Sequence, residues 1–155
     1  MWRDLAAEVN LELAQLQRLL TEYATLLATG GMEGEDPVTT LALAGVLQSF
    51  YHGVENIFGR IARRVDNVKI DGPAWHRELL DAMAAPTANR PAVISEALRD
   101  QLEEFLRFRH MFRHAYSFNL RAGQLAPLAE SCPACFAALA ADVRDFLARG
   151  AGGEP

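Results

Sequence analysis

The sequence of 155 residues has few cysteines and no long apolar run. Its two cysteines, Cys132 and Cys135, are too few for a disulfide framework, which fits a reducing compartment. No stretch approaches the roughly 18–20 consecutive apolar residues of a membrane-spanning helix. The first residues include Asp4, Glu8 and Glu12, where a signal peptide needs an uninterrupted apolar core. We therefore expect a cytoplasmic protein without a membrane partner.

Positive charge is scarce overall. The chain has 15 Lys and Arg against 20 Asp and Glu, a formal net charge of −5, and Lys69 is its one lysine. Half of the residues are apolar and 23% are charged, which excludes intrinsic disorder and a collagen-like chain. On totals alone, the acidic balance argues against a nucleic-acid partner, because phosphate binding needs clustered positive charge. At roughly 100–200 residues per domain, we expect one domain over residues 1–155.

Apolar residues recur every three or four positions along most of the chain, which predicts helices rather than strands. Gly30 and Gly31 end the first helix, Asp36 and Ser95 are predicted N-caps, and Pro37 fits a first helical turn. Pro127 and Pro133 are expected to bracket the start of the last helix, which Gly150 closes. The expected fold is all-α, an up-and-down bundle of four long helices plus one or two short helices. The expected long helices are 2–28, 38–65 (the most buried), 95–116 and 134–148, and the short one is 74–83.

One segment departs from the acidic average. Residues 105–121 contain no acid and hold four arginines and two histidines, namely Arg107, Arg109, His110, Arg113, His114 and Arg121. Without its four arginines the rest of the chain has 11 basic and 20 acidic residues, so the segment carries +4 and the remainder −9. This polarisation favours an anionic partner for that surface.

Arg109 and His114 are five residues apart, an offset of roughly 140° on an ideal helix, so one straight helix would not aim both at one atom. Either the helix ends or distorts near His114, or a second copy in a two-fold dimer completes the site. Histidine can take a proton from a ribose 2′-hydroxyl and return one to the leaving oxygen, while arginine binds the phosphate, without metal. In the alternative, the arginines pair with acids such as Glu103 and Glu104, and the histidines cap or pack.

The run from Arg109 to Tyr116 has the form Arg, four residues, His, one residue, Tyr. It resembles the signature of the HEPN superfamily, specifically its HepT-like toxin branch. The segments LQSFYHGVENIFGRIAR, WHRELLDAM, RPAVISEAL and LRFRHMFRHAYSF follow the order typical of HepT-like proteins and cover about residues 40–120. The resemblance implies an all-α homodimer that is a metal-independent ribonuclease without a cofactor, with the two motifs meeting at a composite cleft.

The resemblance also implies roles for individual residues. Arg109 and His114 correspond to the catalytic pair, as phosphate clamp and acid/base, and Arg107 and Arg113 would give electrostatic support. The HepT toxin is paired with a minimal nucleotidyltransferase antitoxin, MntA, which transfers AMP to the motif tyrosine, here Tyr116. A bulky, negatively charged AMP would block RNA entry and cancel the local positive field. The alternative function is a non-catalytic helical interaction module that binds a nucleotidyltransferase partner or RNA.

The pair Cys132 and Cys135 has the spacing of a redox or zinc motif. A redox site would need an α/β pattern, and a structural zinc would need two more ligands at suitable spacing. We therefore expect ordinary thiols at a helix start. His52 and His76 lie among apolar residues, and we expect them to pack or cap rather than to be ligands.

Two further groups stand out in the sequence. Trp2 and Trp75 are expected to be core or interface anchors. Arg60, Arg63 and Arg64 form a second basic cluster at the end of the predicted central helix. The helix dipole explains this cluster without a function, and the alternative is that it extends an RNA track.

Overall fold

The structure is a computed structural model that describes residues 1–29, 36–116 and 119–153. These residues form six α-helices and no strand, so the all-α prediction is confirmed. Four of the helices are long and two are short, as expected. They are α1 (Trp2–Glu22), α2 (Ala24–Thr29), α3 (Pro37–Arg64), α4 (Trp75–Ala84), α5 (Glu96–His114) and α6 (Ala122–Gly152).

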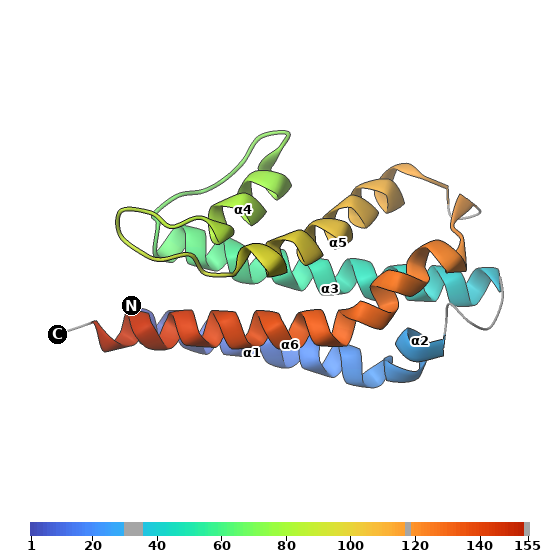
Figure 1. Cartoon of the computed structure of the whole chain (residues 1–155), viewed down its shortest axis with the longest axis horizontal. Helices are drawn as coiled ribbons and strands as arrows, with labels where there is room; N and C mark the ends of the chain where they lie inside the picture. The colour runs from blue at the N-terminus through green and yellow to red at the C-terminus, as the bar shows by residue number, and fades with distance from the viewer. Residues whose placement is uncertain (30–35, 117–118, 154–155) are drawn as a thin grey trace.

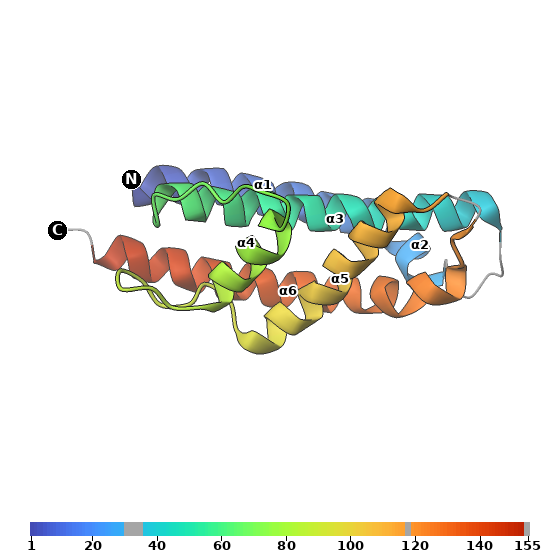
Figure 2. The same cartoon turned by 90° about the horizontal axis from the view of Figure 1, so that it is seen from above.

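The long helices alternate in direction along the bundle. In Figure 1, α1 runs away from the N-terminus, α3 returns, α5 runs outward again and α6 returns, so that both chain ends lie at one end of the molecule. Figure 2 shows that α5 lies obliquely to the axis that α1, α3 and α6 follow. Helix α3 contacts α1, α4, α5 and α6, which makes it the central element of the bundle.

Helix α3 is the most apolar part of the core, as its pattern predicts. Leu43, Phe50, Ile57 and Phe58 have no exposed side-chain surface. The ring of Phe50 meets the ring of Phe105 from α5 edge to face, with 5.1 Å between the centroids. Continuous burial along both sides of α3 explains why nearly every turn of this helix carries large apolar residues.

A glycine allows α1 to approach α3 closely. A Cβ atom built on Gly53 would lie 2.4 Å from Cδ2 of Leu16, which is closer than real Cβ contacts come. Gly45, on the same helix, has nothing within 4 Å of the corresponding position. Gly53 is therefore required by packing, whereas Gly45 is not.

The predicted N-caps are confirmed. The Asp36 carboxylate accepts hydrogen bonds from the Thr39 hydroxyl at 2.7 Å and from the Thr39 backbone N–H at 3.2 Å, and these lower the pKa of Asp36. Pro37 occupies the first turn of α3. The Ser95 hydroxyl accepts from the backbone N–H of Leu98 at 3.1 Å at the start of α5. Each side chain satisfies a backbone donor that the first helical turn leaves without a partner.

The first predicted helix, 2–28, is wrong as one element. It is interrupted at Tyr23, whose backbone φ of −106° and ψ of 22° end α1 before α2 begins. The break places Leu27 of α2 in the core, where α2 contacts α6, so tertiary packing overrides the continuous apolar period. Gly30 and Gly31, expected to end this helix, lie outside the described residues.

The predicted start of the last helix is also wrong. Helix α6 begins at Ala122 and contains both Pro127 and Pro133. Each proline removes one backbone hydrogen bond, but Leu125 before them and Phe136 after them are buried on the same core. The burial of this face favours a continuous helix, and Figure 1 shows that its N-terminal part, in orange, bends.

Gly150 does not close α6, which continues to Gly152. A Cβ on Gly150 would lie 2.3 Å from the indole of Trp2, so this glycine makes room for that ring. Trp2 also meets Phe146 edge to face with 5.6 Å between the centroids, which confirms Trp2 as an anchor between α1 and α6. No helix in the described ranges is long and apolar enough to cross a membrane.

Candidate functional site

Helix α5 ends within the predicted motif, which runs from Arg109 to Tyr116. His114 is its last residue, and Ala115 is extended, with φ −110° and ψ 149°. The expected continuation to Tyr116 is therefore two residues too long. The helix thus ends at His114, as one alternative for the angular offset between Arg109 and His114 expects, and the second copy stays a prediction. Tyr116 lies beyond the helix and is 74% exposed.

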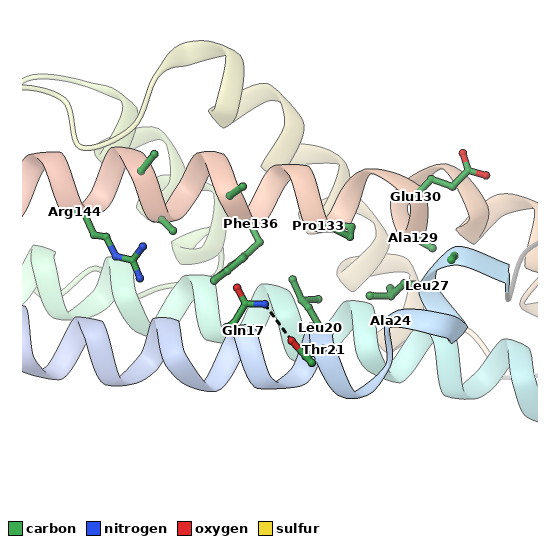
Figure 3. A pocket seen from close by; sticks show the side chains of 14 residues that line it. Gln17, Leu20, Thr21, Ala24, Leu27, Ala129, Glu130, Pro133, Phe136 and Arg144 are labelled. Carbon is green, nitrogen blue, oxygen red and sulfur yellow. Dashed lines mark hydrogen bonds between the residues drawn. The ribbon is translucent and has the colours of Figure 1, made fainter.

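A cavity of about 750 Å³ lies between α1, α2 and α6, remote from the motif. Figure 3 shows its lining, which is mainly alanine and leucine with Phe136, and in which Gln17 donates a hydrogen bond to Thr21. None of the five predicted site residues lines it. Its size does not make it the site, because the groups needed for acid/base or phosphate chemistry lie elsewhere.

A cavity of about 600 Å³ lies between α4 and α5 and takes in most of the predicted site; we call it the basic cavity. Arg107, Arg109, Arg113 and His114 all line it, and Tyr116 does not. No acidic side chain is among its described lining residues, which also include Pro73, Ala74, His76, Arg77, Leu106 and His110. The cavity thus presents concentrated positive charge to any anionic ligand.

Arg109 is held from two sides, by the buried Glu55 and the half-buried His76. Its Nε lies 3.4 Å from Oε1 of Glu55 on α3, and its Nη1 lies 3.4 Å from Nε2 of His76 on α4. Only 12% of the Arg109 side chain and 5% of the Glu55 side chain are exposed. The second Glu55 oxygen contacts Nδ1 of His76, which closes a three-residue network. This network joins three helices and fixes the direction of the Arg109 guanidinium.

The hydrogen bonds of the network indicate the tautomer of neutral His76. Arginine has only donors, so Nε2 of His76 must accept from Arg109. The carboxylate of Glu55 only accepts, so Nδ1 carries the proton and donates to it. A neutral His76 therefore satisfies both neighbours, whereas a protonated ring would turn a donor toward the Arg109 guanidinium.

Tyr51 lies one helical turn before Glu55 on α3. Its hydroxyl is buried without a hydrogen-bond partner among the described residues. Burial raises the pKa of Tyr51, and the negative charge of Glu55 raises it further. The phenol therefore remains neutral beside the network and adds no charge to it.

The other residues of the basic segment differ in their partners. Arg107 forms ion pairs with Glu104 at 3.2 Å and with Glu103 at 3.7 Å, as the structural alternative for this segment expects. Arg113 forms no ion pair within the described part of the chain. His114 is exposed, and its ring lies 4.7 Å from that of His110, centroid to centroid. Arg113 and His114 thus remain available to a ligand, whereas Arg107 is partly engaged.

Glu55 is a site residue that the sequence did not predict, and His76 has a larger role than expected. His76 does pack, with its ring centroid 3.6 Å from that of Trp75, but it also binds Glu55 and Arg109. His52, which was expected to pack or cap, is exposed. A carboxylate in the most apolar helix was the available signal, because a buried charge needs a partner.

The cysteines do not form a reactive pair. Cys132 and Cys135 are free, buried and inside α6 rather than at its start, which corrects their expected location. Burial raises the pKa of both thiols, that of Cys135 to about 12. Protonated buried thiols fit the expectation of ordinary cysteines.

The second basic cluster is divided between two environments. Arg60 and Arg64 form ion pairs with Glu8 of α1, which gives them a structural role between α1 and α3. Arg63 forms no ion pair with any described residue. It faces a separate cavity that also contains Arg109.

The comparison with protein families agrees with the motif and the fold. A family model described as "HepT-like protein" matches residues 42–149, more than half of the chain, and this range contains Glu55, His76, Arg109, His114 and Tyr116. Neither a curated protein nor a solved structure matches the chain. The resemblance to HepT-like proteins of the HEPN superfamily is confirmed at the level of the family. The chain belongs to the HepT-like protein family.

Proposed function

We propose that this protein is a metal-independent endoribonuclease toxin of a toxin–antitoxin pair of the HepT/MntA kind, formed by one domain over residues 1–155. The observation that carries this proposal is that Arg109 and His114 line one basic cavity without an acidic residue in its described lining. Such a cavity attracts a phosphodiester and holds the two side-chain types that can cleave it next to a ribose hydroxyl. Family membership supports the same function.

In the proposed reaction, His114 takes the proton of the ribose 2′-hydroxyl, and the 2′-oxygen attacks the adjacent phosphorus. The bond from phosphorus to the 5′-oxygen breaks, and His114 then returns the proton to that oxygen. The products are a 2′,3′-cyclic phosphate and a free 5′-hydroxyl. Arg109 binds the non-bridging oxygens and stabilises the charge that develops on them. The contacts of Arg109 with Glu55 and His76 hold its guanidinium in place during this step.

We further propose that two subunits form the active cleft. His114 and Tyr116 are exposed at the end of α5, where a second copy can approach. An isologous dimer would bring two copies of the basic segment together and double its charge of +4. The acidic remainder of each subunit would then limit RNA binding elsewhere on the surface.

Regulation is proposed to occur at Tyr116. Its hydroxyl would attack the α-phosphate of ATP bound to an MntA-like nucleotidyltransferase, with pyrophosphate as the leaving group. Tyr116 is 74% exposed and lies two residues beyond His114, so a transferase can reach it. The added phosphodiester would place negative charge beside the basic cavity and obstruct RNA.

The test is growth arrest and RNA cleavage by wild-type protein, His114→Ala and Arg109→Ala, with Arg149→Ala as a matched control. Arg149 is exposed and, within the described ranges, forms an ion pair with its neighbour Asp145 alone, so its variant should remain toxic and active. Wild-type protein should arrest growth and cleave RNA, and the two motif variants should do neither while keeping the same helical content. If wild-type protein and His114→Ala are equally harmless and neither cleaves RNA, the enzymatic proposal is wrong. A transferase complex that forms regardless of Arg109 and His114, again without cleavage, would indicate the interaction module instead.

Modification of Tyr116 is tested separately. Intact-mass measurement after incubation with the partner transferase and ATP should show added AMP, and Tyr116→Phe should not gain it. Retention of the full mass increase in Tyr116→Phe would place the modification at another residue.

A further inference from the structure

A second cavity, of about 390 Å³, lies beside the basic cavity and has no role in the reaction described above. We call it the Trp75 cavity. Its walls come from the C-terminal half of α3, the segment 68–71, the start of α4, and Arg109 of α5. We propose that the Trp75 cavity binds a nucleobase of the RNA strand, next to the phosphate at Arg109. This inference rests on the proposed ribonuclease function, because it specifies how that site takes its substrate.

The size of the Trp75 cavity suits one nucleoside unit. Sites for small organic ligands enclose roughly 300–1,000 Å³, and this one is near the lower end of that range. Leu79 and Ala62 are buried in its wall, whereas His52 and Val68 lie exposed at its surface. Buried apolar side chains beside charged and polar residues are the arrangement that a planar base attached to a charged backbone needs.

Trp75 supplies an aromatic surface within the cavity. Its side chain is half-buried, so part of the indole remains open. The ring packs on His76, with 3.6 Å between the centroids and 31° between the planes. His76 in turn binds Glu55, so the indole rests on a side chain that is itself held. Fixed aromatic rings bind single-stranded nucleic acid by stacking, and they accept every base because every base has a π face.

Two cations of the Trp75 cavity lack an ion-pair partner among the described residues. Arg63 and Lys69 form no ion pair with any residue in the described ranges. The neighbouring Arg60 and Arg64, in contrast, both pair with Glu8. The Arg63 guanidinium lies back over Gly59, with Nη2 3.7 Å from where a Cβ of that glycine would be. Asp71 is the one exposed carboxylate in the described lining, so Arg63 and Lys69 leave an excess of positive charge there, which fits the phosphates that flank a stacked base.

Arg109 connects the two cavities, since it lines both. A phosphate held at Arg109 from the basic cavity therefore has the Trp75 cavity within reach of its attached nucleoside.

The chain offers a direct measurement because it has two tryptophans. Trp2 packs on Phe146 and Gly150 outside both cavities, so Trp2→Phe leaves Trp75 as the one tryptophan reporter. Titration of this variant with GMP or with UMP should quench its fluorescence to saturation, because stacking accepts every base. Ribose 5-phosphate and inorganic phosphate, which have no base, should cause little quenching.

Variants then separate stacking from charge. Equilibrium dialysis with labelled GMP should show a Kd raised roughly fivefold or more for Trp75→Leu, since stacking contributes about 1–3 kcal/mol per base. The surface variants Arg63→Gln and Lys69→Gln should each raise the Kd without unfolding the protein, and Arg149→Gln should leave it unchanged. These surface variants keep the test valid if Trp75→Leu does not fold.

The outcomes distinguish this inference from the function on which it rests. If wild-type protein cleaves RNA but GMP causes no saturable quenching, or no more than ribose 5-phosphate, the nucleobase site is wrong and the ribonuclease stands. If Arg63→Gln and Lys69→Gln bind GMP like wild type, the ligand lies elsewhere and the site is also wrong. Base-dependent binding lost in these variants, without RNA cleavage by any form, supports the nucleobase site and overturns the catalytic proposal.

Discussion

Replacing Glu55 with glutamine should destabilise the protein more than any other loss of a single charge at the site. The substitution keeps the shape of the side chain but removes the charge that lies 3.4 Å from Nε of Arg109. Arg109 stays charged because the guanidinium does not lose its proton in proteins. Glu55→Gln therefore leaves a cation that is 12% exposed with His76 as its remaining partner in the network.

The loss in the free energy of unfolding caused by Glu55→Gln can be estimated from the distance between the two charges. At 3.4 Å and an effective dielectric constant of about 20, the Coulomb attraction is about 5 kcal/mol before solvation is counted. Breaking a buried ion pair costs about 3–5 kcal/mol. Because the cavities on both sides of Arg109 admit water, we expect Glu55→Gln to lower the free energy of unfolding by about 2–3 kcal/mol. With an unfolding entropy of about 2.1 cal/mol/K per residue, this corresponds to a fall in Tm of about 6–9 °C for 155 residues.

The assay is urea unfolding followed by circular dichroism, with thermal melts at the same protein concentration. Concentration is fixed because a dimer would couple stability to it. Glu104→Gln is the matched control: its carboxylate is 59% exposed and pairs with Arg107 on the surface, so its loss should cost at most about 1 kcal/mol.

A double-mutant cycle completes the test. In Glu55→Gln with Arg109→Met no unpaired buried charge remains, so the double variant should be more stable than the sum of the two single losses predicts, by about 1–3 kcal/mol. Equal effects of Glu55→Gln and Glu104→Gln, or strictly additive losses in the cycle, would refute a buried network that holds Arg109.

Three further predictions concern the glycines of α3, the two cysteines and the pH dependence of stability through Glu103. Gly53→Ala should lower the free energy of unfolding by about 1–3 kcal/mol, because the new methyl group meets the side chain of α1, whereas Gly45→Ala should raise it by about 0.5–1 kcal/mol. Cys132 and Cys135 should not react with a thiol reagent at neutral pH until the protein unfolds, since burial raises the pKa of both. The pKa of Glu103 is lowered first by its hydrogen bond from an arginine of α4. Its contribution to stability is therefore present above the ordinary Glu pKa of 4.5 and is lost as the pH falls through the lowered value, which urea unfolding across this range measures.

A specific outcome would contradict each of these three predictions. Equal stability changes for the two glycine variants would mean that α1 does not press on Gly53. Rapid thiol labelling of native protein would contradict the burial of Cys132 and Cys135. The control for the loss of stability at acidic pH is Glu103→Gln. Its free energy of unfolding should depend less steeply on pH below 4.5 than that of the wild type. The same slope in both proteins would show that Glu103 does not contribute there.

Local signals in the sequence were sufficient for most helix boundaries. Asp36 and Ser95 cap helices as predicted because an N-cap acts on backbone donors only a few residues away. The same kind of reasoning failed for Pro127 and Pro133, since their effect on α6 depends on how much core the surrounding turns bury. It also failed at Tyr23, where the break depends on the packing of α2 against α6.

For the candidate site, the sequence by itself determined the all-α class, the basic segment and the motif with Arg109, His114 and Tyr116, because residue type and helical period are local properties. Only the tertiary structure decided that α5 ends at His114 and that Glu55 and His76 hold Arg109. These contacts join residues separated by 33 positions or more, and no local rule relates such positions. The acidic composition argued against an anionic ligand. The positive charge that could bind one is concentrated where α3, α4 and α5 meet, because packing brings these helices together.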